Sequence, residues 1–123
     1  MATAFIKSWG KTRQRKYKNK VTITEDGKFD SLGELKRWEF LKQARVGGQI
    51  AELERQVEFS IDVGADHICS YFADFTYRRS DGLFVIEDYK GVVTDVFRLK
   101  AKMVKIFHGF SVRVVKKFDE PIY

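Results

Sequence analysis

The spacing of apolar residues predicts a helix over residues 31–46. Apolar side chains recur there every three or four positions, which places them on one face of a helix. Gly47-Gly48 follows directly and is typical of a helix end. The apolar positions are Leu32, Leu35, Trp38, Leu41 and Ala44.

Alternating apolar and polar residues predict four strands, at 49–63, 67–78, 83–90 and 110–116. Residues 79–82 have the composition of a hairpin turn, so the second and third strands should pair antiparallel. A helix between the third and fourth strands makes a βαβ crossover, which favours parallel pairing there. We therefore expect an α/β fold with a four-stranded mixed sheet flanked by helices.

The second helix is expected over residues 94–107, capped by Thr94 or Asp95 and closed by Gly109. Three basic residues fall within one narrow arc of it, and such a stripe could follow a DNA backbone. Surface helices often carry lysines, so a solvated face is the alternative. The stripe consists of Arg98, Lys102 and Lys105.

Composition indicates one ordered domain over residues 21–123, because 44% of the chain is hydrophobic and only one residue is proline. Within it, residues 21–30 alternate like a short strand with a turn at Asp26-Gly27. The single cysteine, Cys69, excludes an internal disulfide. The sequence holds no long apolar run for a membrane span and no secretory leader, so we expect a cytoplasmic protein.

The net charge of +6 is concentrated in residues 1–20, which we interpret as a flexible basic arm without an acidic residue. The rest of the chain is nearly neutral, with 16 basic and 17 acidic residues. A cationic arm suits a polyanion, because each neutralised phosphate releases counterions. An arm that only aids solubility is the alternative. Its basic residues are Lys7, Lys11, Arg13, Arg15, Lys16, Lys18 and Lys20.

Three charged residues stand within apolar strands. Asp74 lies in Tyr-Phe-Ala-Asp-Phe, and Asp88 and Lys90 share one face of the next strand. The hairpin can bring Asp74 beside Asp88. Two carboxylates can hold Mg²⁺, which polarises a phosphodiester, while a lysine offsets charge or orients water. A solvated cross-strand ion pair is the alternative.

Glu34 lies within the apolar stripe of the first predicted helix. A buried acid is costly unless it is paired or bound to a cation, so Glu34 is a candidate third acidic ligand. Ser31-Leu32-Gly33-Glu34 also fits a capping box, in which the glutamate only caps the helix. Arg37 could pair with Glu34 or contact a phosphate.

These residues resemble a known signature. Asp74, a spacer, and then Asp88-Tyr89-Lys90 are similar to the D…(D/E)-x-K motif of the PD-(D/E)XK nuclease superfamily, and the predicted αβββαβ order resembles its restriction-endonuclease-like core. A closer likeness, to a family of small phage-encoded proteins, runs from about Lys16 to Val115. Its elements here are Lys16-Tyr17-Lys18-Asn19-Lys20, Phe29-Asp30-Ser31 with Glu34 and Arg37, Leu53 to Gln56, Tyr71 to Phe75, and Glu87 to Thr94.

The resemblance implies Glu34, Asp74 and Asp88 as ligands of Mg²⁺, with Mn²⁺ able to substitute, and Lys90 as the catalytic lysine. It places Gln56 near the active site. Ala73 stands where most relatives carry proline. No small-molecule cofactor is implied. The predicted DNA contacts are Lys11, Arg13, Arg15, Lys16, Lys18, Lys20, Arg37, Arg98, Lys102 and Lys105.

The function expected from these features is a metal-dependent endonuclease for branched DNA, such as a Holliday junction, in phage replication or recombination. Two symmetric cuts would require a homodimer. A basic nucleic-acid-binding module without catalysis is the second interpretation. A sequence-specific nuclease of restriction or homing type is the third, for which 123 residues leave little room.

Overall fold

The computed structural model describes residues 21–122, and the predicted arm at residues 1–20 lies outside them. The chain divides into two compact units, Met1–Leu35 and Lys36–Tyr123. In the first unit, β1 (Thr22–Thr24) pairs antiparallel with β2 (Gly27–Phe29). Residues 21–30 are thus a hairpin of two short strands rather than one strand, because the turn falls in the middle of the segment.

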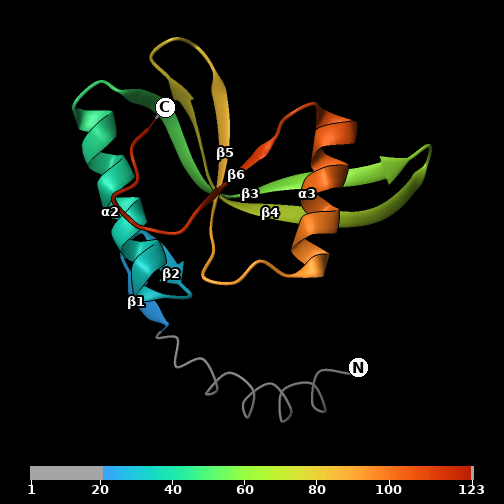
Figure 1. Cartoon of the computed structure of the whole chain (residues 1–123), viewed down its shortest axis with the longest axis horizontal. Helices are drawn as coiled ribbons and strands as arrows, with labels where there is room; N and C mark the ends of the chain where they lie inside the picture. Colours follow the sequence, from blue (N-terminus) through green and yellow to red (C-terminus); the bar gives the residue numbers. More distant parts are fainter. Residues whose placement is uncertain (1–20, 123) are drawn as a thin grey trace. The chain divides into compact units, whose positions relative to one another are not determined.

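The second unit is built on a four-stranded sheet in the order β3-β4-β5-β6 (Figure 1). β3 pairs antiparallel with β4, β4 pairs antiparallel with β5, and β5 pairs parallel with β6. The predicted mixed α/β sheet is therefore confirmed, including the parallel pair across the crossover. The strands are β3 (Ile50–Val63), β4 (Asp66–Arg79), β5 (Phe84–Tyr89) and β6 (Val112–Val115).

Within residues 21–122, two helices accompany the sheet, α2 (Leu32–Val46) and α3 (Asp95–His108). Their ends follow the predicted chemistry. The Ser31 hydroxyl accepts from the Glu34 amide at 3.1 Å, and the Thr94 hydroxyl accepts from the Phe97 amide at 3.1 Å. Gly109 closes α3 with φ 83°, a left-handed conformation that favours glycine.

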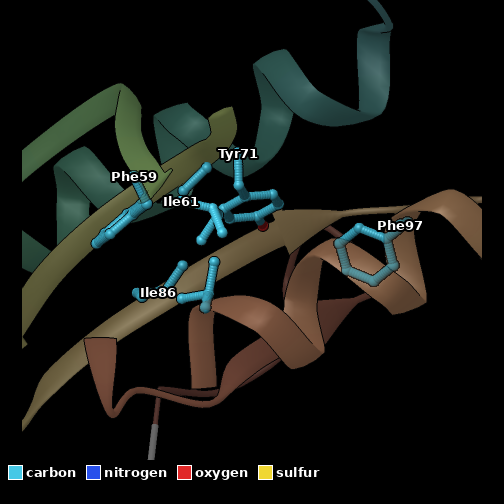
Figure 2. Close-up of a cluster of buried hydrophobic side chains, with 7 residues drawn as sticks. Phe59, Ile61, Tyr71, Ile86 and Phe97 are labelled. Carbon is cyan, nitrogen blue, oxygen red and sulfur yellow. The ribbon is translucent and has the colours of Figure 1, made fainter. Parts of the chain in front are cut away.

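The two helices contact opposite faces of the sheet, as the alternation along β5 shows. Ile86 joins the apolar cluster that receives Phe97 and Val104 of α3. The next residue, Glu87, points to the other face and pairs with Arg37 of α2. Figure 2 shows the cluster on the α3 side, with Phe59, Ile61 and Tyr71 packed beside Ile86 and Phe97. No helix within residues 21–122 is long and apolar enough to cross a membrane.

A buried charge network fixes the C-terminal segment, residues 116–122, to the α2 side of the second unit. Arg37 donates to both carboxylate oxygens of Glu87, at 2.9 and 2.7 Å. Its remaining nitrogen donates to the carbonyls of Phe118 and Glu120, at 3.0 and 2.6 Å. Arg113 adds a bond to the Pro121 carbonyl at 2.6 Å. Residues 118–121 therefore provide further hydrogen-bond acceptors for two guanidinium groups.

Candidate active site

The candidate site forms where the pairing between β4 and β5 stops. Phe75 and Glu87 are the last pair of this ladder, and Asp74 and Asp88 are the next residues on the two strands. On the other side of β5, the Lys90 amide still donates to the Val115 carbonyl of β6 at 3.0 Å. The C-terminal end of β5 is thus still hydrogen-bonded to β6, whereas its backbone pairing with β4 has stopped. Asp74 and Asp88 lie at this opening between β4 and β5.

Asp74 takes the place of a backbone acceptor at the opening. Its Oδ2 accepts from the backbone amide of Tyr89 at 2.9 Å. Its Oδ1 accepts from the side-chain amide of Gln56 at 3.3 Å. In a continued ladder, the Tyr89 amide would donate to the next carbonyl of β4. The Asp74 carboxylate accepts this hydrogen bond instead, so the ladder ends here and the amide orients the carboxylate.

Asp88 is almost fully buried, with 1% of its surface exposed. One oxygen, Oδ1, lies 3.6 Å from the Lys90 ammonium. The other, Oδ2, is buried without a hydrogen-bond partner among residues 21–122. Burial raises the pKa of the Asp88 carboxyl from 3.8 to about 6, and Lys90 opposes this shift. A desolvated carboxylate with one unsatisfied oxygen is a high-energy group that a cation would stabilise.

Lys90 stands beside Asp88 with about a third of its side chain exposed. Its ammonium lies over the ring of Phe97, 4.8 Å from the ring centroid. The sequence predicted that Asp88 and Lys90 share a face, and their contact agrees with that. The sequence did not indicate the contact with Phe97, because Phe97 belongs to α3 and a loop separates α3 from Lys90.

Gln56 joins the site through an unusual backbone conformation. It has φ 53°, in the left-handed region that non-glycine residues rarely adopt. The pairs on either side of it, Val57 with Ala73 and Arg55 with Phe75, place it across from Asp74. The structure therefore brings together Gln56, Asp74, Asp88 and Lys90 of the predicted site.

Glu34 belongs to the first compact unit and is 6% exposed. Its amide completes the Ser31 cap, as one half of the predicted capping box requires. Its predicted role as a ligand stays a prediction. Among residues 21–122 there is no group of three or more His, Cys, Asp or Glu side chains arranged to hold a metal ion.

The two aspartates nevertheless fit the donor chemistry of Mg²⁺. Both offer carboxylate oxygens, which hard divalent cations prefer, and Mg²⁺ in proteins keeps several waters and takes one or two carboxylates. The buried Oδ2 of Asp88 supplies an oxygen that no group within the described part of the chain bonds. Asp74 and Asp88 are thus the residues that could hold a divalent cation here.

The predicted DNA contacts divide into three groups. Those in residues 1–20 lie outside the described residues. Arg98, Lys102 and Lys105 are exposed on α3, and we call them the basic arc. Arg98 also pairs with Asp95 at 2.9 Å, an exposed ion pair that a phosphate can replace at little cost.

The prediction that Arg37 contacts DNA is wrong. Its side chain is fully buried, and its bidentate partner is Glu87 rather than Glu34 or a phosphate. Tyr77 also donates to Glu87 from within the same network. Local sequence patterns carry little sign of this pairing, because 50 residues separate Arg37 from Glu87.

The fold and site together define the class of protein. It is a mixed α/β protein with two aspartates where the pairing of its central strands stops, one of them paired with a lysine. Residues 14–117 match the model of a family described as "Protein of unknown function (DUF1064)". Since the match spans most of the chain, the protein belongs to this family. No curated protein and no solved structure matches the chain.

Proposed function

We propose that this protein is a metal-dependent DNA endonuclease with a restriction-endonuclease-like core of the PD-(D/E)XK type. The observation that carries the proposal is the state of Asp88. Its carboxylate is buried, leaves one oxygen unpaired within residues 21–122, and lies beside an ammonium group. Such a group lowers the stability of a fold unless it serves a ligand.

Asp74 and Asp88 would hold Mg²⁺ or Mn²⁺ at the opened strand end. When bound, the ion supplies Lewis acidity to the scissile phosphate. The Tyr89 amide and the Gln56 side chain keep the Asp74 carboxylate oriented, so little ordering is needed when substrate arrives. Lys90 offers a positive charge to the phosphate oxygens and a donor that orients the attacking water.

DNA is the substrate that best fits the charge distribution. The basic arc is exposed on α3, the helix that also supplies Phe97 beneath Lys90. The seven basic residues of positions 1–20 add further charge without base-reading motifs. We therefore propose recognition of DNA shape, as in a four-way junction, by a homodimer that makes two symmetric cuts. A role in phage replication or recombination within the bacterial cytoplasm belongs to the same proposal.

The test is cleavage of a four-way junction, a flap and a linear duplex with Mg²⁺ or Mn²⁺. Wild type is compared with Asp88→Ala and with Asp119→Asn, which removes an exposed carboxylate elsewhere in the second unit. We expect metal-dependent cutting that Asp88→Ala abolishes while DNA binding persists, and that Asp119→Asn leaves unchanged. Tight binding without cutting of any substrate in either metal would overturn the catalytic proposal.

The second candidate is a nucleic-acid-binding module without catalysis. The exposed basic arc favours it, because that surface can bind phosphates whatever the aspartates do. Equal DNA affinity for wild type and Asp88→Ala, with no metal-dependent change in either, is the result that this alternative expects.

A further inference from the structure

Phe97 contacts Lys90, the cationic side chain among the four residues that the structure brings together in the candidate site. Its ring centroid lies 4.8 Å from the Lys90 ammonium, and that ammonium lies 3.6 Å from Oδ1 of Asp88. We propose that Phe97 is a positioning residue, which holds Lys90 at the Asp88 carboxylate through a cation–π contact. The inference rests on the proposed function, in which Lys90 serves the scissile phosphate.

Lys90 needs such a support because of its place in the chain. It follows the last residue of β5, and about a third of its side chain is exposed. A lysine on a four-carbon stem has many rotamers, and fixing it costs conformational entropy. The ion pair with Asp88 is long, so it restrains the ammonium only weakly. An aromatic face on another side of the ammonium removes much of the remaining freedom.

Phe97 is itself held firmly, which is what a positioning residue requires. It is 8% exposed and lies in the first turn of α3. Its backbone amide donates to the side-chain hydroxyl of Thr94, the N-cap of α3, at 3.1 Å. The cap therefore fixes the backbone that carries the ring. Its ring packs against Tyr71, with centroids 6.2 Å apart, inside the apolar cluster (Figure 2).

A purely structural phenylalanine would behave differently. Leucine at position 97 retains an apolar side chain for the cluster but has no π face, so it removes the contact with Lys90 together with the ring contact to Tyr71. Tyrosine keeps the π face. Phe59 offers a matched control, because it belongs to the same cluster but packs against Tyr71 and the ring of His108.

The experiment combines two measurements on Phe97→Leu, Phe97→Tyr and Phe59→Leu. The first is the NMR spectrum of the Lys90 ε-CH₂ and Nζ groups in the full chain, without metal or DNA. Ring currents should displace these signals in wild type and Phe97→Tyr, and the displacement should vanish in Phe97→Leu. The second is the single-turnover rate of DNA cleavage at saturating DNA, together with the DNA Kd.

We expect Phe97→Leu to cut roughly 3- to 30-fold more slowly with an unchanged Kd, whereas Phe97→Tyr and Phe59→Leu stay near wild type. Lys90 signals that are the same in wild type and Phe97→Leu would overturn the contact, whether or not the protein cuts DNA. An equal loss of rate in Phe97→Leu and Phe59→Leu would show a structural role and overturn the positioning. If wild type cuts nothing, the proposed function fails, and the spectrum alone still decides the contact.

Discussion

Replacing Asp88 with asparagine should stabilise the protein in the absence of metal. The carboxyl is buried, and burial raises its pKa to about 6 although Lys90 pulls in the other direction. Ionised Asp88 therefore costs free energy in the folded state that it does not cost in the unfolded chain. Asparagine has nearly the same shape and never ionises, so the variant is free of that cost.

The magnitude follows from the difference between the two pKa values, about 6 in the fold and 3.8 in the unfolded chain. At about 1.4 kcal/mol per unit, this difference amounts to roughly 3 kcal/mol. Well below pH 3.8 the carboxyl is protonated in both states, and the cost is absent. As the pH rises from about 4 to 6, the unfolded state loses its proton first, so wild-type stability falls by this amount relative to the variant.

The assay is urea unfolding of wild type and Asp88→Asn from pH 4 to pH 8 with EDTA present, with Asp119→Asn as the control for loss of one exposed charge. Above pH 6 the expected gain for Asp88→Asn is roughly 3 kcal/mol, or roughly 10 °C in Tm. Addition of Mg²⁺ should stabilise wild type but not the variant. An Asp88→Asn protein that folds but is no more stable than wild type at pH 7.5 without metal would refute the reasoning.

Three further predictions concern other parts of the second unit. Arg37→Ala should lower the free energy of unfolding by about 3–5 kcal/mol, because it leaves Glu87 buried without its main partner; loss of DNA affinity with unchanged stability in urea would contradict this. Tyr71→Phe should raise stability by roughly 1 kcal/mol, since the Tyr71 hydroxyl is buried with no partner inside the described chain; a destabilised variant would point to a hydrogen bond at that hydroxyl. Changing all three residues of the basic arc to alanine should reduce the slope of log K against log salt by about 2 to 3 in DNA-binding titrations, and an unchanged slope would remove α3 from the DNA surface.

The fold was largely predictable because its elements are encoded by local patterns. The period of apolar residues gave the helices and strands, and cap residues such as Thr94 and Gly109 marked the ends of α3. The hairpin and the crossover then left few ways to order the sheet. The segment 21–30 was the exception, because two strands of three residues are too short to show alternation separately.

The candidate site was predictable only in part. Asp74, Asp88 and Lys90 were visible as charges within apolar strands, and the strand register brings them together. The partners of these residues were not visible, because the Tyr89 amide and the ring of Phe97 carry no signal of their own. Arg37 was assigned to the surface because charged residues are rarely fully buried, and only the tertiary structure supplies Glu87.

The network around Arg37 has a consequence for the order in which the second unit can fold. Two carbonyl acceptors of Arg37 come from Phe118 and Glu120, and these contacts span 81 and 83 residues of the chain. Contacts between residues so far apart in the sequence form at a high cost in loop-closure entropy. The strands can pair before residues 116–122 are in place, but the Arg37 guanidinium lacks two of its acceptors until that segment docks. Docking of residues 116–122 should therefore be a late step of folding, and substitutions there should speed unfolding more than they slow folding.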